Sequence, residues 1–210
     1  REEWRDREWR VFRHVYRELT EMVDAEVGQV LDALCESGLK GDTLVVFTSD
    51  HGDMDGAHKL QHKSVLYEEA SRIPFIMSHT GVIPEGADDN EHLVSNGLDL
   101  LPTLCDAADI ECPEGLQGNS LLQIARGDAD VAWRDHVVGE SLHGRMLRTD
   151  RFKYCVYFSG DNREQLFNLE EDPGEMTNLA GDGSARGVLE QHRQYLKEWL
   201  QKTGDSTALR

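Results

Sequence analysis

An aspartate and a histidine stand next to each other at the end of an apolar run. Asp50 and His51 follow residues 43–48, which are nearly all apolar or β-branched and so predict a strand covered on both faces. Ligands of open α/β sheets bind outside the carboxyl ends of such strands. A carboxylate beside an imidazole suits a divalent metal ion. The alternative is a turn in which Asp50 caps the backbone and His51 is simply polar.

More imidazoles and a cation follow within a short polar stretch. His58, His62 and Lys63 lie soon after the Asp-His pair. A metal ion with a lysine nearby is a known way to hold an oxyanion, because both neutralise charge that develops on it. On spacing alone, a solvated loop that carries histidines and a lysine is a serious competitor.

The charge balance excludes some classes of partner. The chain has 210 residues with 22 Lys and Arg against 40 Asp and Glu, which gives a formal net charge of −18. Such a protein cannot replace the counterions of a phosphate backbone, so we expect no nucleic-acid partner and no binding to anionic membranes. No apolar run approaches the roughly 20 residues that span a bilayer.

The first part of the chain predicts an α/β layer. Apolar residues repeat with helical spacing over residues 9–34, and Gly38 is placed to end that helix. The strand at 43–48 comes next, residues 73–77 form a second strand candidate, and another helix is expected to start near Ser95 or Asn96.

The sequence from residue 136 onward has a different pattern. Short strand candidates separated by turns predict an antiparallel meander, and residues 188–200 repeat as an amphipathic helix that would cover one of its faces. The strand candidates are residues 136–140, 146–149, 153–158 and 165–169. The connection falls within residues 115–135, so we divide the chain into domains 1–125 and 126–210.

Four cysteines, Cys35, Cys105, Cys112 and Cys155, contain no CxxC pair. This spacing argues against zinc-ribbon and thioredoxin-type sites. A disulfide between Cys105 and Cys112 stays open, because pairing depends on geometry. We expect unpaired, mostly buried thiols.

Several segments together resemble the sulfatases of the alkaline phosphatase superfamily, in the family's order and over essentially the whole chain. The run at 43–58, with Lys63, residues 67–69 and residues 72–74, resembles the second metal-binding segment. Residues 22–28 and 166–179 match as well. The resemblance implies part of an alkaline-phosphatase-like α/β/α sandwich, followed by a smaller antiparallel sheet packed by a C-terminal helix.

The resemblance also implies roles for four residues. Asp50 and His51 match the ligands of a divalent cation, Ca²⁺ in most members, with Mg²⁺ or Mn²⁺ as alternatives. Lys63 matches the lysine that contacts the sulfate oxygens, and His58 is placed to contact the substrate or its leaving group. His62, Arg72 and Glu68 are interpreted as structural, and residues 172–175 as a turn.

One family motif is missing from the chain. The family's formylglycine nucleophile arises from Cys-x-Pro-x-Arg or Ser-x-Pro-x-Arg, but Cys112 is followed directly by Pro113 and no arginine comes after it. The resemblance therefore implies the C-terminal portion of a longer enzyme, inactive alone. Its expected partner is the missing N-terminal half. A lone C-terminal piece is expected to self-associate or aggregate, since it would expose strand edges and an apolar helix face.

The expected function is hydrolysis of a sulfate ester on a small molecule or glycan, in which a hydrated aldehyde attacks sulfur. A phosphodiesterase or phosphonate monoester hydrolase of the same superfamily is the nearest alternative, since the same residues suit phosphoryl oxygens. A non-catalytic truncated module is the third. Periplasmic, secreted or lysosomal locations are common in the family, but no signal in this chain selects one.

Overall fold

The computed structural model of the chain describes residues 4–128 and 131–205, and it forms two compact units. The first unit is built from residues up to His62, Arg72–Asn90 and Ser95–Val131. The second is built from Lys63–Ser71, Glu91–Val94 and the residues from Ala132 onward. The second unit therefore takes two short segments out of the middle of the first.

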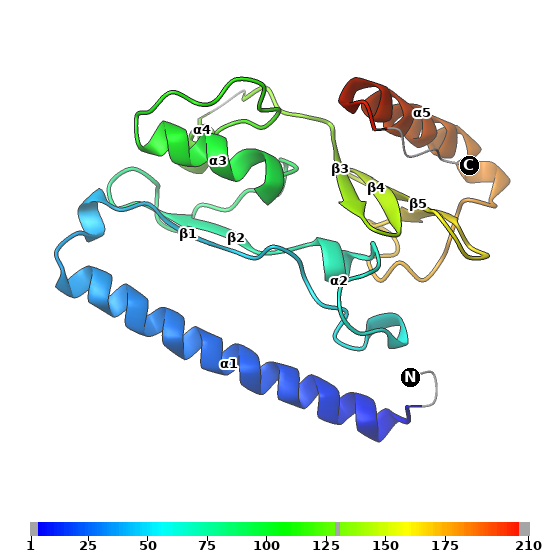
Figure 1. Cartoon of the computed structure of the whole chain (residues 1–210), viewed down its shortest axis with the longest axis horizontal. Helices are drawn as coiled ribbons and strands as arrows, with labels where there is room; N and C mark the ends of the chain where they lie inside the picture. The colour runs from blue at the N-terminus through cyan, green and yellow to red at the C-terminus, as the bar shows by residue number, and fades with distance from the viewer. Residues whose placement is uncertain (1–3, 129–130, 206–210) are drawn as a thin grey trace. The chain divides into compact units, whose positions relative to one another are not determined.

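The elements follow the chain in the order labelled in Figure 1. The first unit holds α1 (Asp6–Glu36), β1 (Val45–Thr48), β2 (Phe75–Ser78), α3 (Asn96–Ala107) and α4 (Leu122–Arg126), with 3₁₀ turns at Lys40–Asp42 and Ala57–Lys59. The second unit holds α2 (Glu68–Ser71), β3 (His136–Ser141), β4 (Gly144–Thr149), β5 (Phe152–Tyr157), β6 (Glu164–Asn168) and α5 (Arg186–Thr203), with a 3₁₀ turn at Gly183–Ala185.

The helix α1 begins and ends where local chemistry allows it. The Glu8 carboxylate accepts a hydrogen bond from the Arg5 backbone N–H at 3.0 Å, which satisfies a donor that helix starts leave unpaired. The chain leaves the helix through Gly38 at a φ of +73°, a left-handed conformation that glycine adopts without cost. Although α1 carries the predicted apolar stripe, none of its residues is buried.

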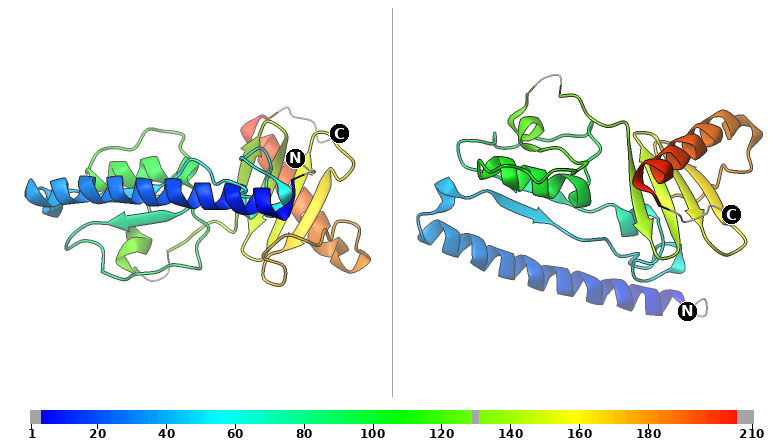
Figure 2. Two further views of the ribbon diagram at one scale, coloured as in Figure 1. Left: turned by 90° about the horizontal axis from the view of Figure 1, so that it is seen from below. Right: turned by 45° about the horizontal axis from the view of Figure 1, so that its top comes forward.

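The strands β1 and β2 pair antiparallel, with Val45 opposite Ser78 and Thr48 opposite Phe75. Both views of Figure 2 show α1 running alongside this pair. The expectation that β1 is covered on both faces is wrong for the described residues, because Phe47 is 42% exposed. An apolar run indicates that a strand is suited to burial. It does not indicate which other element, if any, covers the strand.

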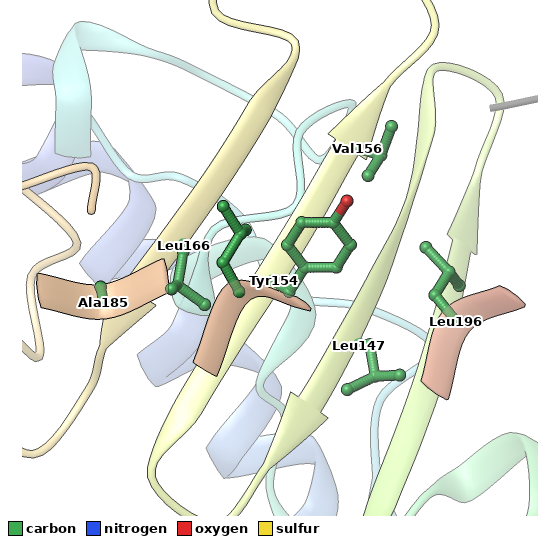
Figure 3. Close-up of a cluster of buried hydrophobic side chains, with 7 residues drawn as sticks. Leu147, Tyr154, Val156, Leu166, Ala185 and Leu196 are labelled. Carbon is green, nitrogen blue, oxygen red and sulfur yellow. The ribbon is translucent and has the colours of Figure 1, made fainter. Parts of the chain in front are cut away.

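The second unit confirms the predicted meander. Its strands follow the order β3-β4-β5-β6, and every neighbouring pair is antiparallel. The helix α5 lies over one face of this sheet (Figure 1). Figure 3 shows the core between them, where Leu147, Tyr154 and Leu166 from the strands meet Leu196 from α5.

The strand β5 is covered on both of its faces. Because side chains alternate along a strand, Tyr154 and Val156 join the core under α5, while Lys153 and Cys155 point to the opposite face. There the Lys153 ammonium contacts Glu68 of α2 at 3.0 Å. The segment Lys63–Ser71 thus covers the second face of the sheet.

Smaller expectations have mixed outcomes. All four cysteines are unpaired, as expected, but only Cys105 and Cys155 are buried. The short helix α4 lies in the stretch that the sequence indicated as a connection. It was not predicted, because the residues around it are polar and rich in glycine. Within the described part of the chain, no helix combines the length and apolar character that a membrane span requires.

The core under α5 makes a direct prediction about stability. Leu196 is fully buried, so Leu196→Ala should lower the free energy of unfolding by about 2–5 kcal/mol. Leu142 is 92% exposed, and Leu142→Ala should change it by less than about 0.5 kcal/mol. Urea unfolding followed by circular dichroism measures both, and equal effects would contradict the described packing.

Candidate functional site

The side chains of Asp50 and His51 converge just beyond the end of β1. Asp50 Oδ2 lies 3.2 Å from His51 Nε2, and Asp50 Oδ1 accepts a hydrogen bond from the His51 backbone N–H at 3.0 Å. The Asp50 side chain is 82% exposed. Both side chains are therefore held next to each other at an accessible surface.

The position of the second ring nitrogen of His51 bears on its chemistry. Nδ1 lies 2.8 Å from the Gly52 carbonyl oxygen, and a carbonyl oxygen can only accept a hydrogen bond. A proton on Nδ1 leaves a lone pair on Nε2, the nitrogen that faces the Asp50 carboxylate. Such a backbone contact is how metal-binding histidines are commonly oriented. A carboxylate oxygen and an imidazole nitrogen thus lie side by side just beyond the end of β1.

The start of α3 supports the backbone that carries this pair. The Asn96 side chain donates a hydrogen bond to the Ser49 carbonyl oxygen at 2.7 Å. The residue before Asn96 is held by the fully buried Asp99, whose carboxylate accepts hydrogen bonds from the backbone N–H of Ser95 at 2.9 Å and of Asn119 at 3.1 Å. The sequence predicted the helix start but not this support, although the polar residues at the start were its visible signal.

The loop that follows the pair is strained. Four residues of it that are not glycine have left-handed backbone conformations: Asp55, His58, Lys59 and His62. Each such residue costs of order 1–3 kcal/mol and persists only where the surroundings enforce it, which is common at functional sites. His58, predicted to contact substrate, has a φ of 51°.

Contacts with α1 and with the loop's own end enforce this conformation. The Met54 backbone N–H donates to the His62 carbonyl at 3.0 Å, and the Met54 side chain is buried. Arg13 of α1 pairs with Asp55 at 3.3 Å. The ring of Trp9 lies so close to Gly56 that an added Cβ would stand 3.1 Å from it, so a larger residue would crowd the ring as well as strain the positive φ.

The loop also brings acidic groups against α1. Asp53 accepts a hydrogen bond from the Asp55 backbone N–H at 2.9 Å. Burial raises the pKa of the Tyr16 hydroxyl, and the charges of Asp53 and Asp55 raise it further. Negative charge therefore gathers on the α1 side of the loop.

Lys63 belongs to the second unit, where it is exposed at the start of the segment Lys63–Ser71. Glu68 of that segment pairs with Lys153, a contact that agrees with its interpretation as a structural residue. In residues 4–128 and 131–205, no three His, Cys, Asp or Glu side chains gather closely enough to hold a metal ion. Asp50 and His51 fit a cation in donor type, as a carboxylate beside an imidazole.

Comparison with known families adds the decisive observation. Residues 56–202 match the family model of the C-terminal domain of N-sulphoglucosamine sulphohydrolase, which is well over half of the chain. The chain belongs to this sulfatase family. The match begins at Gly56, so it includes His58 and Lys63 and extends through most of α5.

Relatives and solved structures agree with this assignment. The chain is 34% identical to the Delta 4,5-hexuronate-2-O-sulfatase of Bacteroides thetaiotaomicron over 211 residues, which covers 96% of this chain and 44% of that protein. A solved 2-O GAG sulfatase superposes with a TM-score of 0.89 at 34% identity, over 96% of this chain and 45% of that one. The alkaline-phosphatase-like fold predicted from the sequence is confirmed.

A third structure belongs to a different hydrolase. The phosphonate monoester hydrolase of Agrobacterium radiobacter superposes with a TM-score of 0.73 at 27% identity, over 86% of this chain and 39% of that one. In each of these comparisons the chain spans less than half the length of the relative. It corresponds to the C-terminal portion of the sulfatases.

The support of the Asp-His pair by α3 is open to test. Asn96→Ala leaves the Ser49 carbonyl without its side-chain donor and should lower the free energy of unfolding by about 1 kcal/mol. In the matched control Asn90→Ala, the lost amide contacts Asp88 in an exposed loop, and the change should stay within about 0.5 kcal/mol. Urea unfolding compares the two, and an Asn96→Ala protein as stable as the control would count against this support.

Proposed function

We propose that this chain is the C-terminal part of a sulfatase, an enzyme that hydrolyses sulfate esters. The convergence of Asp50 Oδ2 and His51 Nε2, 3.2 Å apart at the end of β1, carries the proposal. The family match supports it, because it covers the adjoining loop and Lys63.

Asp50 and His51 would hold a divalent cation, which would neutralise charge on the sulfate oxygens. Calcium is the proposed ion, with magnesium or manganese as alternatives that a carboxylate and an imidazole also accept. Lys63 would place its ammonium against the sulfate oxygens, and His58 would contact the leaving group or the substrate. The strained backbone at His58 supports a functional role for that loop.

The nucleophile is proposed to come from outside this chain. Its sequence has no Cys-x-Pro-x-Arg or Ser-x-Pro-x-Arg segment, and the relatives extend well beyond the matched portion. We infer that a formylglycine in the N-terminal portion supplies the attacking group, so this chain alone should not turn over a sulfate ester.

The relatives indicate which substrates to try first. One is named as a hexuronate 2-O-sulfatase and another as a 2-O GAG sulfatase. Sulfated glycans are therefore our proposed substrate class, with small sulfated molecules as the alternative. The likeness to a phosphonate monoester hydrolase favours a second candidate function, hydrolysis of a phosphonate or phosphate ester.

A substrate comparison on the intact protein tests the function. It should hydrolyse sulfate esters in preference to matched phosphate and phosphonate esters. Lys63→Ala should lower kcat/KM by about 10²–10³-fold, as the loss of an oxyanion contact does elsewhere. The control Lys197→Ala removes an exposed lysine of α5 and should leave the rate unchanged.

Asp50→Ala should lower the rate and also weaken Ca²⁺ binding, measured by calorimetry without substrate. Preference for the phosphonate ester would move the assignment to the second candidate function. An intact protein that hydrolyses none of the three esters would support the non-catalytic module instead.

The first unit also indicates a partner. An apolar groove of about 970 Å³ lies between α1 and the β1–β2 pair, lined by residues that include Val23, Val30, Phe47 and Ile76. Of these, Val30 is 69% exposed and Ile76 is 58% exposed. Contiguous apolar surface of this kind marks an interaction site. Because the relatives carry more than half of their length outside the matched portion, we propose that the N-terminal portion of the same protein fills the groove.

The exposed groove predicts how the isolated chain behaves. We expect the chain alone to self-associate, as measured by light scattering after size-exclusion chromatography, since burial of this apolar surface is favourable. Val30→Asp should restore a monomer by placing a charge in the groove. Gln29→Asp adds the same charge beside the groove on the same helix and should not. A monodisperse wild-type monomer would contradict the proposal.

A further inference from the structure

The segment that begins with Lys63 is fastened to the four-stranded sheet of the second unit. The backbone N–H of Leu66, three residues after Lys63, donates a hydrogen bond to the Tyr157 hydroxyl oxygen at 3.0 Å. Leu66 itself is buried. The backbone N–H of Glu68 donates to Glu175 Oε2 at 2.6 Å. Two backbone positions soon after the lysine are thus bound by side chains of the sheet and of the turn that follows β6.

A buried charge reinforces these anchors. The Lys153 side chain has no exposure, and its ammonium lies 3.0 Å from Glu68 Oε1 and 2.9 Å from Glu175 Oε1. It also donates to the Ser71 hydroxyl at 3.3 Å. A buried ammonium that loses a partner carries a large penalty, so a shift of the segment that removed Glu68 from Lys153 would be costly.

Glu175, which contacts both the segment and Lys153, has a strained backbone conformation. Glu175 has a φ of 51°, a conformation that costs a non-glycine residue energy and requires support from its surroundings. Its side chain is almost fully buried against Lys153. One carboxylate therefore binds the segment through Oε2 and the buried ammonium through Oε1.

Of these contacts, the one that Tyr157 makes with Leu66 holds the position closest in sequence to Lys63. Tyr157 is the last residue of β5, the strand that also carries Lys153, so the hydroxyl and the ammonium share one rigid element. Burial raises the pKa of the Tyr157 hydroxyl further above physiological pH, so the hydroxyl is neutral there. A neutral hydroxyl on a paired strand gives the Leu66 backbone a fixed acceptor.

We propose that Tyr157, supported by Lys153 and Glu175, is a positioning residue that holds the lysine-bearing segment so that Lys63 meets the sulfate oxygens in a fixed place. This inference rests on the role of Lys63 in the proposed function. A misplacement of about 1 Å can cost 10²-fold in rate, so the loss of one anchor should be measurable although Tyr157 touches no substrate.

A double-mutant cycle on the intact protein tests the coupling. Tyr157→Phe should lower kcat/KM for a sulfate ester by about tenfold and weaken competitive inhibition by inorganic sulfate, because a mobile Lys63 binds the sulfate group less well. In the Lys63→Ala background, Tyr157→Phe should have no further effect, since residues that act through one another are not additive. The control Tyr195→Phe removes a hydroxyl that bonds to Gln191 on α5 and should change neither constant.

A second readout needs no activity. Trypsin cleaves after Lys63, so release of this segment in Tyr157→Phe should speed cleavage there several-fold, while Tyr195→Phe should leave the rate as it is. Equal loss of kcat/KM on both Lys63 backgrounds, or unchanged cleavage, would overturn the positioning role while leaving the proposed function intact. A Lys63→Ala protein with full activity would instead remove both that function of Lys63 and the inference built on it.

Discussion

An ammonium group without access to water has to be surrounded by acceptors, and in this protein that demand organises the second unit. Lys153 takes its partners from α2 and from the turn after β6. Three features of the unit accompany it: β5 is an inner strand of the sheet, the segment that contains α2 covers the face opposite α5, and Glu175 adopts a left-handed backbone conformation. Replacing such a cluster piece by piece is costly, because each single loss leaves a buried charge behind.

In the first unit, the polar pair singled out by the sequence is accessible rather than buried. Asp50 and His51 meet at the surface, and what holds them is the backbone, through the Asn96 amide on the Ser49 carbonyl. The loop beyond them is strained but well supported by Trp9 and Arg13 of α1. Rigid support beneath exposed side chains keeps their geometry fixed while leaving them accessible.

Local pattern was enough to predict most of the fold. The apolar period found α1 and α5, Gly38 ended the first helix, and alternation with turns found the meander. The Asp50-His51 pair was visible because it follows a strand. The support of this pair by Asn96 and the network around Lys153 could not be predicted. Asn96 is 47 residues from Ser49, and Lys153 is 85 residues from Glu68. Residue types alone do not show which distant polar groups meet, and the apolar run of β1 did not tell that Phe47 is exposed.

The interleaving of the two units has a consequence for how the protein forms during synthesis. The backbone N–H of Glu68 donates to Glu175, which is synthesised 107 residues later. At ribosomal rates of about 5–20 residues per second, the interval is roughly 5–20 s. For that time the lysine-bearing segment leaves the ribosome without its sheet, and Leu66 has nothing to pack against. The second unit must therefore close last, and any cut that separates residues 63–71 from the sheet divides a structure that neither piece can complete.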